Sequence, residues 1–144
     1  MRITLLTQSD PFYLAENIDY LIAQLPNHST IVSAVLFDVS PFGKRESFSA
    51  KIIRTFRIFG TWFFINYGSQ YIMNRFRRRK SVEYVFERHH IPVIKLVNQV
   101  NHRESLASIK SFSPDLLISI AGNQIFKRPL IDLAPQGCLN LHSA

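Results

Sequence analysis

The hydrophobic residues of this chain fall into short uninterrupted runs that alternate with stretches of helical periodicity. Five runs have the length and the β-branched, apolar content of buried strands. They are Arg2–Thr7, Thr30–Phe37, Pro92–Val97, Asp115–Ile120 and Cys138–His142. Apolar residues at helical spacing, often behind a capping residue or a proline, predict helices between these strands. The helices are expected to begin near Ser9-Asp10-Pro11, Phe48, Ser81, Arg103 and Pro129.

Strands that alternate with helices indicate parallel pairing through right-handed crossovers. We therefore predict an α/β fold with a Rossmann-like open parallel sheet and helices on both faces. The 144 residues are enough for a single domain. Ligands of such sheets bind beyond the carboxyl ends of the strands. This rule draws attention to the residues that follow each strand, among them 121–126 and 140–144.

A basic and aromatic segment at about 41–80 interrupts this alternation and reads as a helical insertion. The chain carries a net charge of +7, and residues 44–80 hold ten basic residues against a single acid, Glu46. Phe and Ile recur at helical spacing from Phe48 to Phe64, with interruptions expected at Gly60 and Gly68. That spacing favours core packing, while clustered charge beside aromatic rings is also typical of a nucleic-acid-binding module. The residues that could bind an anionic ligand, or simply form a solvated face, are Arg75, Arg77, Arg78, Arg79 and Lys80.

Several common classes of site lack sequence support. Neither G-x-G-x-x-G nor G-x-x-x-x-G-K-[ST] occurs, so a dinucleotide or nucleoside triphosphate site is not indicated. No zinc spacing is present, and His89-His90 fits a solvated helix end, so we expect no metal. A single cysteine, Cys138, excludes an internal disulfide and favours a reducing compartment. The N-terminus does not have the pattern of a signal peptide, and the apolar stretch Ile52–Ile65 is too short to span a bilayer. We therefore expect a cytoplasmic protein without a membrane partner.

Two polar residues at the last predicted strand are candidates for chemistry. Asn140 and His142 lie two residues apart, so strand alternation places both side chains on one face. An amide can donate a hydrogen bond to a developing oxyanion, and an imidazole can relay a proton near neutral pH. The pair therefore suits acyl transfer. A structural role in local hydrogen bonding is the alternative for two polar residues at a strand end.

The segment that leads to this pair carries a more specific pattern. A strand is followed by S-x-x-G-x-x-I-x, a short Pro-Leu-Ile-Asp-Leu helix, a Pro-x-Gly turn and N-L-H-S. This order resembles the folate-dependent formyltransferase family, which includes enzymes acting on methionyl-tRNA, glycinamide ribonucleotide and sugar nucleotides. The resemblance is strongest over residues 113–143 and weaker over 1–38 and 81–112.

The resemblance implies a reaction and assigns roles to matching positions. The reaction would be formyl transfer from 10-formyltetrahydrofolate to a substrate amine, without a metal. Asn140 matches the asparagine that holds the formyl oxygen, and His142 matches the histidine that assists beside it. The loop that lines the folate pterin pocket in the family matches Ile120, Ala121, Gly122, Asn123, Gln124, Ile125 and Phe126.

The sequence also departs from the family pattern. The family continues with a Leu-Pro and Arg-Gly segment and a later catalytic aspartate, whereas this sequence stops at Ala144. We therefore expect an incomplete domain, with little or no activity in this chain alone. Glycinamide ribonucleotide is disfavoured as acceptor because TQSDPFYL is not a glycine-rich phosphate loop. That segment and the insertion look more like the sugar-modifying members, and the acceptor remains either an amino-sugar nucleotide, another small amine or initiator tRNA. A non-catalytic remnant and a basic nucleic-acid-binding module remain alternatives.

Overall fold

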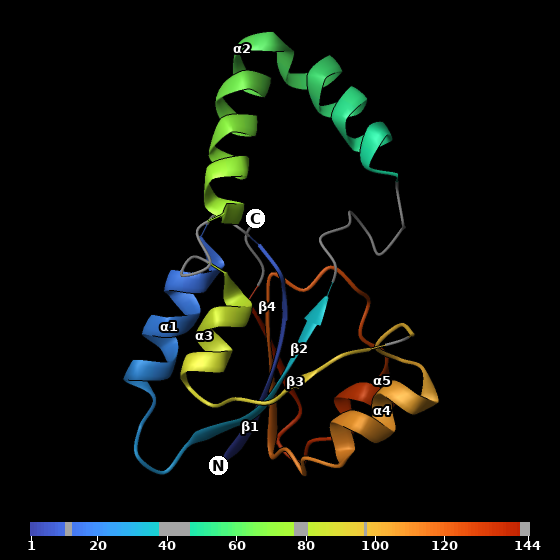
Figure 1. Cartoon of the computed structure of the whole chain (residues 1–144). Coiled ribbons are helices and arrows are strands. Elements are labelled where there is room, and N and C mark those ends of the chain that lie inside the picture. Colours follow the sequence, from blue (N-terminus) through green and yellow to red (C-terminus); the bar gives the residue numbers. More distant parts are fainter. Residues whose placement is uncertain (11–12, 38–46, 77–80, 97, 142–144) are drawn as a thin grey trace.

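A parallel sheet with helices on both faces forms the body of the protein (Figure 1). The computed structural model describes residues 1–10, 13–37, 47–76, 81–96 and 98–141. The strands of this part are β1 (Arg2–Gln8), β2 (Thr30–Phe37), β3 (Val93–Ile94), β4 (Leu116–Ile120) and β5 (Cys138–Leu141). The helices are α1 (Leu14–Gln24), α2 (Phe48–Phe76), α3 (Val82–Arg88), α4 (Arg103–Lys110) and α5 (Arg128–Ile131).

The strand order is β3-β2-β1-β4-β5, and every pair is parallel. From β1 the chain builds the sheet outward through β2 and β3, and it then returns to the other side of β1 for β4 and β5. The direction of strand addition therefore reverses between β1 and β4. Crevices at the carboxyl ends of strands around such a reversal are the usual ligand sites of open α/β sheets. The predicted fold class is confirmed.

Strand alternation sends side chains into two cores. On one face, Ile3 and Leu5 pack with Ile18 of α1 and with Val85 and Phe86 of α3. On the other face, a second core joins β1, β2 and β4 to α4 and α5. Its most deeply buried members include Leu6, Val35, Ile109, Leu117 and Leu130. The sheet is thus covered on both sides, which explains why its central strands read as continuous apolar runs.

Some helices and strands begin or end at other residues than the apolar pattern predicts. Ser81 caps α3 as expected, since its Oγ accepts a hydrogen bond from the Tyr84 N–H at 3.1 Å. The expected start of α1 near Ser9-Asp10-Pro11 is wrong, because α1 begins at Leu14. Asp10 instead accepts a hydrogen bond from the N–H of Tyr13 at 3.0 Å, one residue before the helix begins. The third strand, expected at Pro92–Val97, is shorter in the part of this segment that the structure describes, where Val93 and Ile94 pair with Ala34 and Val35 of β2.

The described part of the insertion, residues 47–76, contains one element, α2, whose two helical arms meet at Gly60. Gly60 has φ 75° and ψ 177°, a conformation that is largely restricted to glycine. The expected interruption at Gly60 is confirmed. The interruption expected at Gly68 is wrong, because this residue lies inside the second arm with helical backbone angles.

Core packing of the insertion is also contradicted. Ile53, Phe56 and Phe59 are exposed by 53%, 47% and 55%, and Trp62 by 81%. In Figure 1 the two arms stand above the carboxyl edge of the sheet, with their bend at the far end. Helical periodicity correctly indicated a helix, but it could not tell whether the apolar residues face the sheet or solvent.

Candidate functional site

The predicted site lies where β4 and β5 end side by side. In the sheet, Ser119 pairs with Asn140, and Ile120 pairs with Leu141. The Ala121 N–H then donates to the Leu141 carbonyl at 3.2 Å, which continues the contact beyond the strand. Asn140 shares its sheet face with Cys138, which packs against the α4–α5 core. Because Asn140 lies nearer the carboxyl edge, its side chain is exposed to solvent.

The loop Ile120–Phe126 is held in place by the turn that precedes α4. The Gln124 Oε1 accepts a hydrogen bond from the Val100 N–H at 2.9 Å. Asn101 binds the loop twice: its Nδ2 donates to the Ile125 carbonyl at 2.7 Å, and its Oδ1 accepts from the Lys127 N–H at 2.9 Å. A backbone N–H and one side chain from a segment distant in sequence, those of Val100 and Asn101, therefore fix the path of this loop, which favours a preorganised binding surface.

A close approach between Gly122 and β4 explains the glycine in this loop. A Cβ atom on Gly122 would lie 2.5 Å from the Ser119 Oγ and 3.1 Å from the Phe126 Cζ. The preceding residue, Ala121, has a positive φ of 54°, which is uncommon for a residue with a side chain. The chain thus turns sharply at the end of β4. Further along the loop, the apolar side chain of Ile125 is 83% exposed.

Two buried hydroxyl groups flank the point where strand addition reverses. Thr7 and Ser119 are fully buried on β1 and β4, and their Oγ atoms have no hydrogen-bond partner among the described residues. Burying a hydroxyl without a partner costs free energy.

The Cys138 thiol, on the neighbouring strand β5, is also partly buried. Burial raises the pKa of this thiol, so it stays protonated near neutral pH and is a poor nucleophile.

The structure places some of the predicted site residues and leaves others outside its description. Asn140 and the loop Ile120–Phe126 lie together at the carboxyl edge, beside the reversal point, as the sequence predicted. His142 lies outside the described residues, as do 77–80 with the basic run, and the side chain of Arg75 is also outside them. The contribution of Asn101 was missed, because its partners are about 25 residues away and no local pattern marks it.

The histidine pair at the end of α3 is not simply solvated. The His89 Nε2 lies 2.6 Å from the Asp19 Oδ1, and Arg88 also contacts this carboxylate, so α3 is tied to α1. The hydrogen bond with His89, together with Arg88, holds the pKa of Asp19 below its usual value. The expectation of a solvated helix end is therefore wrong for His89 and holds for His90, which is exposed.

A cavity next to His89 lies near the amino end of β2, at the opposite end of the strands from the candidate site. It has a volume of about 260 Å³, and its walls include Ile22, Leu25, Thr30 and His89. These residues belong to the end of α1, the start of β2 and the end of α3. This cavity is therefore remote from Asn140. Across the described ranges, no three His, Cys, Asp or Glu residues converge as metal ligands would.

Comparison with known proteins adds to the geometry of the carboxyl edge. No family model matches the chain. Its sequence is 38% identical to a methionyl-tRNA formyltransferase of Geotalea daltonii and 40% identical to one of Citrifermentans bemidjiense. Both matches span 63 residues, which are 44% of this chain and 20% of each relative. A methionyl-tRNA formyltransferase of Clostridium perfringens is 34% identical over 56 residues, which are 39% of this chain and 18% of that relative.

These similarities support a relationship with the formyltransferase family over the matched part of the chain. The relatives that share this stretch are named methionyl-tRNA formyltransferase. The chain spans about a fifth of the length of these relatives.

Proposed function

We propose that the carboxyl edge of the sheet is the donor side of a formyltransferase site. The reaction would transfer a formyl group from 10-formyltetrahydrofolate to a substrate amine. The observation that carries this proposal is the pairing of Ser119 with Asn140, which brings an exposed amide next to the fixed loop Ile120–Phe126. The names of the relatives support the same reaction class.

The loop has features that suit a flat heterocycle. A pterin ring needs an apolar wall and peptide groups along its edge, as do most small-molecule ligands. Ile125 is largely exposed and Phe126 is half-buried, so both can supply apolar surface. The hydrogen bonds from Val100 and Asn101 hold the loop backbone in one geometry, which lowers the entropic cost of binding.

Each site residue has a role in this proposal. When bound, 10-formyltetrahydrofolate supplies the formyl group. The Asn140 amide donates a hydrogen bond to the formyl oxygen as negative charge develops on it. His142 accepts a proton from the attacking amine near neutral pH, and the proton then returns to the leaving nitrogen of the folate. The Cys138 thiol takes no part, because burial raises its pKa and keeps it neutral.

Methionyl-tRNA is the first acceptor to test, because the matched relatives are named for it. An amino-sugar nucleotide is the second, because the segment after β1 and the insertion resemble the sugar-modifying members. We propose in addition that residues 1–144 alone turn over little, since the family aspartate has no counterpart at a matching position in them.

Donor binding tests the proposal without depending on turnover. We expect Ile125→Asp to weaken binding of 10-formyltetrahydrofolate by at least about tenfold, because a charge would replace the apolar wall of the loop. Ile125 is so exposed that this change should not unfold the protein. The matched control is Ile72→Asp on α2, an exposed position far along the chain from the loop. Binding that is absent in the parent chain, or equal in both variants, would contradict the proposed donor site.

Formyl transfer is then measured with methionyl-tRNA and with amino-sugar nucleotides. Where turnover is detected, Asn140→Ala should lower it by about 10²–10³-fold, because a donor to the developing oxyanion is lost. Asn17→Ala on the exposed side of α1 is the control for an asparagine change outside the site. Equal rates for the two variants would exclude Asn140 from the reaction, and robust turnover by the parent would contradict its expected low activity.

A further inference from the structure

The bend of α2 presents aromatic rings to solvent. Phe59 and Phe63 have ring centroids 4.6 Å apart, and Phe63 stacks on Tyr67 at 5.3 Å. Across the bend, Phe56 of the first arm meets Phe64 of the second at 5.9 Å in an edge-to-face arrangement. These contacts hold the two arms together, yet Phe59 remains 55% exposed. The rings therefore stabilise the helical hairpin that the two arms of α2 form, without removing its apolar surface from water.

Aliphatic side chains extend this apolar surface along both arms. The exposed large apolar residues of α2 are Ile52, Ile53, Phe56, Ile58, Phe59, Trp62, Phe63, Ile65, Tyr67, Ile72 and Met73. Single exposed apolar residues are ordinary on protein surfaces, but a large continuous group of them indicates an interaction site. The residues lie on one hairpin that stands away from the sheet (Figure 1), so this group calls for a partner outside the described fold.

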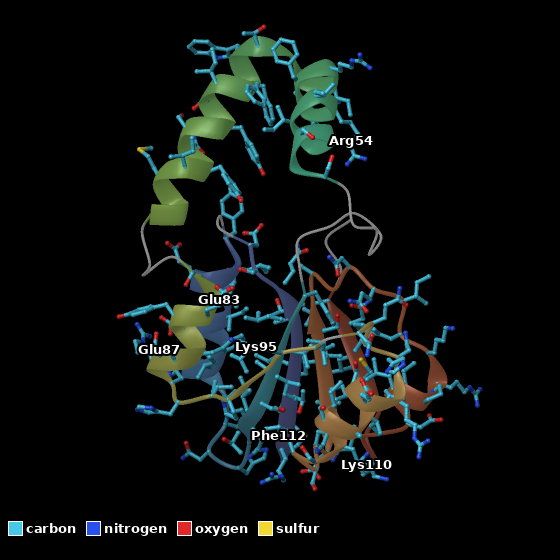
Figure 2. All side chains as sticks on the ribbon, turned by 45° about the vertical axis from the view of Figure 1, so that its right-hand side comes forward. Arg54, Glu83, Glu87, Lys95, Lys110 and Phe112 are labelled. Carbon is cyan, nitrogen blue, oxygen red and sulfur yellow. The ribbon has the colours of Figure 1, made fainter. Side chains whose placement is uncertain are left out.

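The charge of the same segment has one sign. No Asp or Glu occurs between Glu46 and Glu83. The basic residues of this interval are Lys51, Arg54, Arg57, Arg75, Arg77, Arg78, Arg79 and Lys80. Figure 2 shows Arg54 on the first arm, on the side away from the second. Arginine side chains can lay their apolar stems along an apolar surface while the guanidinium reaches its polar boundary.

We propose that α2 docks onto the surface of an anionic phospholipid membrane, with the bend around Gly60 inserted among the lipids. Trp62 and its aromatic neighbours would occupy the headgroup and upper acyl region, which is where amphipathic aromatic rings prefer to lie. Arg54 and Arg57 would contact the phosphates, since basic residues near a surface are attracted to anionic lipids. None of the described helices has the length and apolarity of a bilayer span. Docking on the surface needs no span, so it revises the sequence-based expectation of no membrane partner.

Two other occupants fit the surface less well. A second copy of the chain would bring two hairpins of the same positive charge together, which is unfavourable. A nucleic acid would satisfy the charge and could stack on the rings. However, Ile53, Ile58, Ile65 and Met73 are aliphatic and exposed, and bases do not stack on aliphatic side chains as they do on rings. Acyl chains match these residues better.

The chain offers a built-in probe, because Trp62 is its only tryptophan. Vesicles of equal parts phosphatidylglycerol and phosphatidylcholine should shift Trp62 emission to shorter wavelength and should carry the protein into the vesicle pellet. Pure phosphatidylcholine vesicles should do so much more weakly, and added salt should weaken the anionic binding. Unchanged emission and no sedimentation with anionic vesicles at low salt would overturn the proposal.

Variants separate the apolar contribution from the charge. Ile58→Gln with Ile65→Gln should weaken binding to anionic vesicles by at least about tenfold, because buried apolar area drives insertion. Ile125→Gln, at a more exposed position outside α2, is the matched control and should bind as the parent does. Arg54→Gln with Arg57→Gln should reduce the preference for anionic over neutral vesicles, while Arg103→Gln with Lys110→Gln on α4 should not. Equal binding by the apolar variant and its control would also overturn the proposal.

The fluorescence emission of Trp62 also distinguishes a membrane from a second copy of the chain and from a nucleic acid. A short-wavelength emission without vesicles that reverts on dilution would identify a second copy as the occupant and overturn the proposal. Quenching by stoichiometric RNA, combined with no response to anionic vesicles, would identify a nucleic acid and overturn it equally. These readouts do not use folate, so their failure is independent of the proposed formyl transfer.

Discussion

The sheet body and the α2 hairpin use similar apolar residues in opposite ways. Phe86 on α3 is fully buried in the core that it shares with α1 and β1, whereas Phe59 on α2 is more than half exposed. The sheet buries apolar residues on both faces, but the hairpin rings pack mainly on one another. The sheet therefore gains its stability within the chain. The hairpin leaves apolar surface that is expected to gain stability only from a partner.

The largest expected effect is a contrast between these two phenylalanines. Phe86→Ala should lower the free energy of unfolding by about 3–5 kcal/mol, because it opens a cavity in the core. Phe59→Ala should lower it by no more than about 0.5–1.5 kcal/mol, because the half-exposed ring contributes mainly its contact with Phe63. Urea unfolding of both variants measures the contrast. A loss of several kcal/mol for Phe59→Ala would instead show that the α2 hairpin is part of the cooperative core.

A smaller effect tests whether the loop at the carboxyl edge is packed as tightly as the core. Gly122→Ala should cost about 1–3 kcal/mol, because the new methyl group would overlap the Ser119 Oγ. Ser119→Ala removes that oxygen, so the double variant should recover part of the loss. A double-mutant cycle from urea unfolding gives the coupling. If the two changes are strictly additive, Gly122 is not held against Ser119 as described.

Two glycines of α2 sharpen the contrast within the hairpin. Gly68 is helical with open space where a Cβ would lie, so Gly68→Ala should stabilise its arm by about 0.5–1 kcal/mol. Gly60→Ala should instead change the angle of the bend, because alanine rarely adopts φ 75° with ψ 177°. Spin labels at Ile53→Cys and Ile72→Cys, in a Cys138→Ser background, would report the distance between the arms. The same distance in both glycine variants would contradict a bend set by Gly60.

The smallest effect concerns the link between α1 and α3. Asp19→Asn should cost about 0.2–1 kcal/mol near neutral pH, the usual range for a partly exposed ion pair. The pKa of Asp19 is lowered in the folded protein, so its contribution is present above its ordinary value of 3.8. It is lost as the pH falls through the lowered folded value. The difference in free energy of unfolding between Asp19→Asn and the parent should therefore disappear as the pH is lowered through this range. The exposed control Asp132→Asn should differ little from the parent at neutral pH.

The sequence predicted most of the sheet and less of the rest. Strand runs such as Thr30–Phe37 are apolar because both faces of the sheet are covered, and this pattern depends on local residues alone. The position of Asn140 followed from the same strand assignments. The hydrogen bonds of Asn101 with the loop and the contact of His89 with Asp19 join segments that are distant in sequence, so hydrophobic periodicity could not reveal them. Nor could it show that α2 faces solvent, since a helical apolar pattern is the same for a core and for a docking surface.

The most direct test of the proposed donor site maps where a folate donor binds. Backbone amide resonances of the ¹⁵N-labelled chain would be recorded while 10-formyltetrahydrofolate is added. A donor site at the carboxyl edge predicts shifts in the amide resonances of Ala121–Phe126 and Asn140, with little change in α2 or around His89. Shifts confined to the cavity beside Ile22 and His89, or no shifts at all, would contradict a donor site at the carboxyl edge of the sheet.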